Sequence, residues 1–189
     1  MKHFIHTVAL LALAAALAGC GVPGDHSSDA ASVNGVAISR DAWLKVVDGS
    51  QKTLELRGIP TDTKTADGRR RLEASQIAAL RELIREEVYQ QMAHEKHISV
   101  SDAEIDQSIK ALDATLGSHA ALEAKLDSAG QTDVDLRHLI FVNSLRLKLR
   151  QADPNFSVAL DKRLRAGIQA YVGPCSTNHA WPACTGQDP

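Results

Sequence analysis

The chain has 189 residues, of which 23% are charged, and its formal net charge at pH 7 is −2. This balance argues against a general nucleic-acid-binding protein, because such proteins concentrate positive charge. No segment after residue 20 is apolar enough to span a membrane, and the roughly 170 residues that follow can form one domain with a substantial core.

The first twenty residues have the pattern of a bacterial lipoprotein signal. Lys2 supplies a positive charge, and the apolar run from Val8 to Leu17 is too short to favour a membrane-spanning helix. The run ends in Leu17-Ala18-Gly19-Cys20, which matches a lipobox. We expect a signal peptide over residues 1–19 and lipidation of Cys20, so that the chain is exported and anchored to the periplasmic or extracytoplasmic face of a bacterial membrane. An ordinary secretory signal cleaved near Cys20, or a retained anchor, is the alternative.

Residues 20–32 are mostly small and polar, which predicts a flexible tether. An Asn-Gly pair follows within Val33–Ile38, and it predicts a hairpin because both residues accept the positive φ of a type I′ turn. Ser39 is placed to cap a helix that carries Trp43 and ends near Gly58.

The longest regular pattern runs from Asp67 to His97. Apolar residues recur there at spacings near three and four, with Arg, Glu and Gln between them, as in an amphipathic helix. A helix of this length spans about 45 Å and needs other helices against its apolar stripe.

Four further helices are predicted. Ser101 and Glu104 form a capping box for the first, and Ser118 begins a shorter helix that stops near Gly130. Thr132 caps the third, which has apolar residues almost all round and is therefore predicted to be the most buried. Ser157 is expected to cap the last helix.

The order of these elements resembles the N-terminal domain of the SurA/PrsA/PpiD-type exported chaperones. The resemblance rests on Leu80–Val88 followed by Ile98–Ile105, on Val33–Ser39, and on Gly130–Arg150. It covers residues 33–172 and implies a mainly α fold of about six helices with a minimal β-hairpin or short sheet. In this family the closing segment pairs with the hairpin, and Ala170–Val172 is β-prone and placed to do so.

One part of the family pattern is missing. Relatives commonly carry a parvulin-type prolyl isomerase domain before the closing helix, whereas only residues 151–156 occupy that place here. Six residues cannot hold a domain, which needs about 50. The resemblance therefore implies binding without catalysis and without a cofactor.

The function expected from the resemblance is a chaperone-like lipoprotein that holds unfolded or partly folded exported proteins near a membrane. Trp43, Tyr89 and Met92 are candidate client contacts, with core packing as the alternative for each. The competing functions are an assembly or adaptor lipoprotein with one partner, and a peptidyl-prolyl isomerase with unrecognised chemistry.

Residues 173–189 form an irregular tail that contains Cys175 and Cys184. We expect these two cysteines to form a disulfide in an oxidising compartment, because Cys20 is taken by lipid. A metal site that uses His179 as a third ligand is the alternative, although three irregularly spaced ligands make a poor zinc site.

Charge and histidine placement leave further interpretations open. Ser99–Asp135 contains eight acidic and two basic residues, and Arg137–Arg165 contains seven basic and two acidic ones. Two helical layers that face each other or water explain this, and so does a polarised client groove. His94 and His97 are three residues apart and are interpreted as a solvated pair rather than a metal site.

Overall fold

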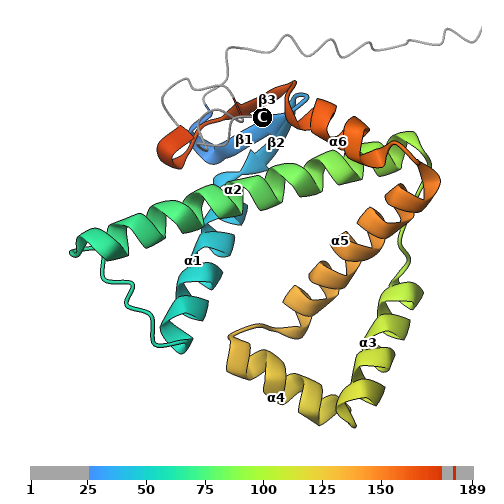
Figure 1. The fold of residues 1–189 in the computed structure, drawn as a ribbon, viewed down its shortest axis with the longest axis horizontal. Coiled ribbons are helices and arrows are strands. Elements are labelled where there is room, and N and C mark those ends of the chain that lie inside the picture. Colours follow the sequence, from blue (N-terminus) through green and yellow to red (C-terminus); the bar gives the residue numbers. More distant parts are fainter. Residues whose placement is uncertain (1–25, 176–180, 182–189) are drawn as a thin grey trace, which may run out of the picture.

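The structure, a computed structural model, describes residues 26–175 and residue 181. Six α-helices and a three-stranded antiparallel sheet make up this part of the chain (Figure 1), which confirms the predicted mainly α fold. None of the described helices combines the length and the apolar character that crossing a membrane requires. The helices are α1 (Arg40–Leu56), α2 (Ala66–Glu95), α3 (Asp102–Leu116), α4 (His119–Ala129), α5 (Asp133–Ala152) and α6 (Phe156–Leu164).

The sheet brings the two ends of the domain together. Strand β1 (Asp29–Val33) lies between β2 (Val36–Ser39) and β3 (Ile168–Ala170). Asn34 and Gly35 join β1 to β2 with φ values of 51° and 84°, as the predicted hairpin turn requires. The third strand pairs with the hairpin as expected, but two residues earlier than predicted.

The predicted tether is wrong at its C-terminal end. Asp29–Ser32 belong to β1, and Ala30 and Ala31 are completely buried between the neighbouring strands and the helices. Small side chains that look like a linker in the sequence are here the ones that let α2 approach the sheet closely. Residues 20–25 lie outside the described part of the chain.

Local capping signals fix most helix starts. Ser39, Ser101, Ser118 and Thr132 each accept a hydrogen bond from a backbone N–H of the first turn, as predicted. The last helix differs, because α6 begins at Phe156 after Asn155, whose side chain makes no capping bond. Ser157 therefore lies within the first turn and does not cap the helix.

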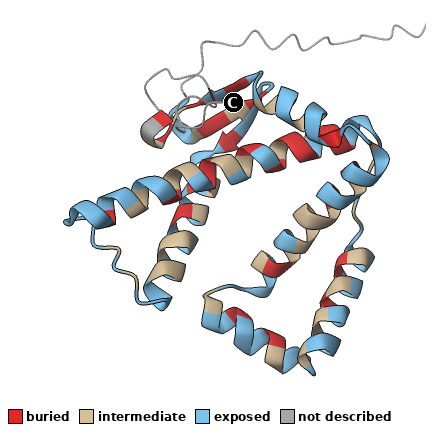
Figure 2. Ribbon diagram, in the orientation of Figure 1, coloured by how far each residue is buried: buried red, intermediate tan, exposed pale blue. Residues whose placement is uncertain are grey.

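The larger part of the molecule, which we call the hub, comprises the sheet, α1, α2, α6 and residues 142–152 of α5. Its core follows the buried face of α2, as the red segments of Figure 2 show, and Ile84, Val88 and Met92 are almost completely inaccessible to water. Leu149 of α5 and Val33 of β1 pack into the same cluster. The amphipathic pattern of residues 67–97 thus correctly predicts the helix around which the hub is built.

The smaller part, which we call the arm, comprises α3, α4 and residues 133–141 of α5. It has a separate core, and among the described residues only Val100 and Phe141 pack against both clusters. The arm extends away from the hub and returns toward α1 at the end of α4 (Figure 1). The five buried members of its core are Ile105, Ile109, Leu122, Leu126 and Leu136.

The prediction that the Thr132 helix is the most buried is wrong. α5 buries only Leu136, Leu145 and Leu149, whereas α2 buries ten residues. α5 packs against α2 at one end and against α3 and α4 at the other, so that part of its circumference faces water. Leu139 and Leu147 lie on that exposed part.

Candidate client-binding surface

The three client contacts predicted from the sequence lie in the hub core. Trp43, Tyr89 and Met92 are all buried. The Trp43 Nε1–H donates to the Gln76 carbonyl oxygen at 3.0 Å, and the Tyr89 ring packs 6.0 Å from the ring of Phe156 between centroids. Client contact through these side chains stays a prediction, and it requires the core to open.

A carboxylate at the root of the arm joins it to the hub. Glu86 on α2 is buried, with 11% of its side chain exposed, and it accepts hydrogen bonds from Gln90 Nε2 at 3.1 Å and His138 Nε2 at 3.0 Å. His138 is on α5 and is half exposed, so water reaches the bond from the α5 side. His138 is therefore a polar link between two helices.

A second link lies farther along α5. Lys148 Nζ is 2.6 Å from Glu104 Oε1 on α3 and donates to the Ser99 carbonyl oxygen at 2.7 Å. The ammonium group of Lys148, with further hydrogen bonds from the Ser101 backbone and hydroxyl, lowers the pKa of Glu104 to about 2. This carboxylate stays ionised at any physiological pH and holds the start of α3 against α5.

At its far end the arm touches α1. A Cβ placed on Gly130 would lie 2.9 Å from Leu56 Cδ1, so the end of α4 is directly against the last turn of α1. Lys45 Nζ is also 3.8 Å from Asp135 Oδ1, between two partly exposed side chains. These contacts close a loop of helices through α1, α2, α5 and α4, and exposed ion pairs of this kind contribute little stability.

Large apolar side chains remain exposed around this closing contact. Leu56 at the end of α1 is 53% exposed, Val134 in the first turn of α5 is 66% exposed, and Leu139, five residues farther along α5, is 50% exposed. We call these three residues the junction surface. Large exposed apolar side chains beside a contact between two parts of a molecule are candidates for a protein-binding surface.

Sequence reasoning missed the junction surface. Leu56 and Val134 are nearly eighty positions apart, and only the return of α4 to α1 brings their helices together. The sequence did contain one indication of exposed apolar residues. Apolar residues occur all round α5, and an arm of a single layer of helices cannot cover all of them. The sequence interpretation took that pattern as deep burial instead.

Charged side chains pair within the arm and within the hub. Arg137 donates to Asp106 at 2.7 Å, and this bond raises the pKa of the guanidinium, while Arg163 donates to Glu95 and lowers the pKa of that carboxyl. His119 is 3.1 Å from Asp113, which raises the pKa of the imidazole. The acidic and the basic segments of the chain meet in the ion pairs Arg137–Asp106 and Lys148–Glu104, and a polarised groove stays a prediction.

The densest basic run has a local role. Arg69 donates to the carbonyl oxygens of Thr63 and Lys64, and Arg71 donates to that of Pro60. Arg70 pairs with Asp67. The run therefore fixes the loop between α1 and α2.

The described residues contain no group of three or more histidine, cysteine, aspartate or glutamate side chains arranged to hold a metal ion. His94 and His97 are both exposed at the end of α2. An open hollow of about 520 Å³ lies nearby between the α2–α3 loop and the end of α5. It is lined by His97, Ile98, Ser99, Lys148, Gln151 and Ala152.

The cysteine predictions fall mainly outside the described residues. Cys175 is completely buried against the hub, but its predicted partner Cys184, the alternative ligand His179 and the predicted lipidation site Cys20 are not described. Both the disulfide and the lipidation stay predictions.

The architecture defines the class of protein to which the chain belongs. A hairpin closed by a C-terminal strand and a long central helix are the features that the sequence resemblance led us to expect. The family model described as a SurA-like N-terminal domain matches residues 1–140. The chain therefore belongs to the family of SurA-like N-terminal domains, and no parvulin domain was detected in it.

No curated protein and no solved structure matches the chain. The family match ends within α5, so α6, β3 and the C-terminal segment lie beyond the matched residues. The match supports the family resemblance that the sequence analysis placed on the hairpin and the long helix.

Proposed function

We propose that this protein is a chaperone-like lipoprotein that binds unfolded or partly folded exported proteins at a bacterial membrane without catalysing a reaction on them. The observation that carries the proposal is membership of the SurA-like N-terminal domain family over residues 1–140. The proposed role follows from the kind of protein in which such domains occur and from the apolar side chains that the arm leaves exposed.

The junction surface is the proposed first contact for a client. Leu56 and Val134 belong to different parts of the molecule, and at this far end of the arm the two parts are joined by a glycine contact and one exposed ion pair. A slight separation of the hub and the arm at this contact would enlarge the exposed apolar surface and leave the cores of both parts intact. Binding of varied, flexible segments is expected to be weak, with a Kd near 1 μM, equivalent to about 8 kcal/mol.

An aggregation assay tests this function. A urea-unfolded outer-membrane protein diluted into buffer should scatter less light when the chain is present, and a proline-containing peptide should isomerise at its uncatalysed rate. The triple variant Leu56→Ser, Val134→Ser, Leu139→Ser should lose most of the effect, while Leu147→Ser, an equally exposed leucine on α5 away from the junction, should keep it.

Two other results would reject the proposal. Tight stoichiometric capture of one folded protein, with no effect on aggregation, would identify an adaptor. Isomerase turnover would identify an enzyme.

Membrane anchoring through Cys20 is part of the proposal. Cys20→Ala should move the protein from the membrane fraction to the soluble fraction, or leave an uncleaved precursor. Identical fractionation and migration of the wild type and the variant would show that the chain is not a lipoprotein.

A further inference from the structure

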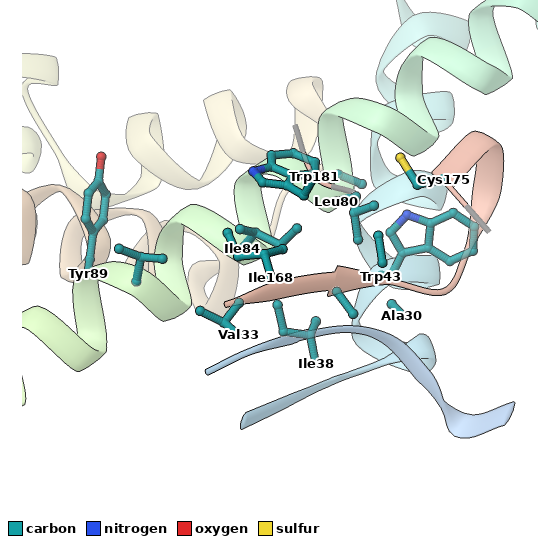
Figure 3. Packing of buried hydrophobic residues seen from close by; sticks show 14 of the residues in the cluster. Ala30, Val33, Ile38, Trp43, Leu80, Ile84, Tyr89, Ile168, Cys175 and Trp181 are labelled. Atoms are coloured by element: carbon teal, nitrogen blue, oxygen red, sulfur yellow. The ribbon is translucent and has the colours of Figure 1, made fainter. Parts of the chain in front are cut away.

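One hydrogen bond across the root of the arm joins a buried carboxylate to a histidine. Glu86 on α2 has 11% of its side chain exposed, and its Oε2 lies 3.0 Å from His138 Nε2 on α5. Figure 3 shows Ile84, on the same helix, beside Ile168 of the sheet, so this stretch of α2 is fixed to the hub core. Glu86 therefore holds a constant place, and movement at this link is expected on the α5 side.

The position of the link makes it sensitive to opening of the arm. The arm shares the packing of Val100 and Phe141 with the hub, whereas its far end meets α1 at Gly130. His138 lies between these two places, about 5 Å along α5 from Phe141 at a rise of 1.5 Å per residue. A rotation of the arm about Val100 and Phe141 that separates its far end from α1 also carries His138 away from α2. Opening at the junction surface therefore lengthens the bond to Glu86.

The charge of His138 decides how strong the link is. A neutral imidazole with its proton on Nε2 donates one ordinary hydrogen bond to the carboxylate, while an imidazolium donates a charge-assisted bond that is roughly twice as strong. Histidine is the side chain that changes charge between about pH 5 and 8. The stronger form of the link is therefore present at the acid end of that range and is lost as the pH rises.

The neighbouring charged groups of α5 are engaged with other helices. Asp135, one turn before His138, is 3.8 Å from Lys45 of α1. Hydrogen bonds from the side chain and backbone of Thr132 lower the pKa of Asp135 most, and Lys45 and His138 contribute less. On the α3 side, Arg137 is paired with Asp106, which raises the pKa of the guanidinium. Asp135 and Arg137 thus keep their charges from pH 5 to 8, and Glu86 is the carboxylate of the hub that His138 contacts.

We propose that the Glu86–His138 pair is a pH-sensitive latch that regulates the junction surface. When His138 is charged, the latch holds the arm against α1 and limits client binding. When His138 is neutral, the arm opens more readily, and client segments bind more tightly. This inference rests on the proposed function and adds its regulation, but the movement of the arm is measurable without a client.

Hydrogen exchange of the full-length chain without a client tests the latch. Protection factors, which correct for the pH dependence of intrinsic exchange, should be about fivefold lower at pH 8 than at pH 5.5 at the end of α1 and in the first turn of α5. In His138→Gln they should be equal at the two pH values, because the amide donates to Glu86 at either pH as a neutral imidazole does.

His119 provides the matched control. Asp113 raises the pKa of this second arm histidine, so its own stabilisation is also present at low pH and lost as the pH rises. His119→Gln should keep the pH response at the end of α1, because His119 is bonded within the arm and not to the hub. A response that disappears in His119→Gln and persists in His138→Gln would reject the latch.

Client affinity at two pH values tests the regulation. Reduced and alkylated ribonuclease A, an unfolded secreted protein, should bind the wild type about fivefold more tightly at pH 8 than at pH 5.5. His138→Gln should bind it equally well at both, and so should Glu86→Gln, which leaves a charged His138 without its carboxylate. Titration of the client itself affects all three proteins alike. If Glu86→Gln does not fold, His138→Gln at its half-exposed position decides the question alone.

The outcomes separate this inference from the proposed function. Equal protection in the wild type at both pH values, or an unchanged pH response in His138→Gln, overturns the latch, and the aggregation assay still decides the proposed function. Client affinity that does not follow the movement of the arm overturns the regulation. Absence of client binding at both pH values, with protection that follows His138, would reject the proposed function and keep the latch.

Discussion

The hub and the arm are built from similar helices but differ in how much each buries. In the described residues the hub cluster contains 21 buried side chains, and the arm cluster contains five. The hub also closes its sheet with strands from both ends of the domain, whereas the arm depends on links at Glu86, Lys148 and the α1 contact. The arm is therefore the part expected to open under native conditions, because local opening follows low local burial.

The largest effect is expected from a cavity in the hub. Ile84→Ala removes a completely buried side chain from α2 and should lower the free energy of unfolding by about 2–5 kcal/mol. Leu44→Ala on the exposed side of α1 should change it by about 0.5 kcal/mol or less. Urea unfolding followed by circular dichroism measures both, and a loss below about 1 kcal/mol for Ile84→Ala would refute the assignment of the main core.

A cavity in the arm should destabilise the arm without destabilising the hub. Leu136→Ala removes a buried member of the small cluster, at a local cost of about 2–3 kcal/mol. Hydrogen exchange should then accelerate in α3, α4 and the start of α5, while amides of α2 and the sheet keep their protection. Equal loss of protection in both parts would show that hub and arm unfold as one unit.

A glycine in the hub provides a matched pair of variants. A Cβ at Gly68 would lie 2.0 Å from the Asp62 carbonyl oxygen, so Gly68→Ala must displace the α1–α2 loop and should cost about 1–3 kcal/mol. A Cβ at Gly49 in α1 meets no atom within 4 Å, and Gly49→Ala should be neutral or stabilise by about 0.5–1 kcal/mol. Thermal unfolding of both variants measures the difference, and equal midpoints would contradict the close approach at Gly68.

Lowering the pH should destabilise the arm before it destabilises the hub. The pKa of Glu104 is lowered to about 2, so its stabilisation is present above the ordinary value of 4.5 and is lost as pH falls through that interval toward 2. The protection factors of α3 amides, which correct for the pH dependence of the intrinsic exchange rate, should fall over this range. Glu104→Gln should show faster exchange at pH 7 and a flatter acid response, and an unchanged profile would exclude Glu104 as a source of the sensitivity.

Local chemistry made much of the fold predictable. The capping boxes of α3 and α5, the Asn34-Gly35 turn and the long periodic helix depend on residues close in sequence, and all are present in the structure. The closing strand was predicted from the β-prone residues Ala170–Val172 together with the family resemblance. The structure places this strand two residues earlier than predicted, because a strand of only three residues has a weak sequence signal at its ends.

The candidate site was less predictable, because it depends on which faces meet. Trp43, Tyr89 and Met92 have the residue types of a binding surface, but the packing of α1 and α6 on α2 places them in the core. Leu56, Val134 and Leu139 were not selected, because each looks like an ordinary member of an apolar stripe.

The measurement that most directly tests the central claim is hydrogen exchange of the full-length chain with and without an unfolded client. With reduced and alkylated ribonuclease A in excess, the end of α1 and the first turns of α5 should exchange more slowly, because the client covers Leu56 and Val134. The middle of α2 should be unchanged. Client binding that leaves the junction surface unprotected, or no binding at all, would contradict the account.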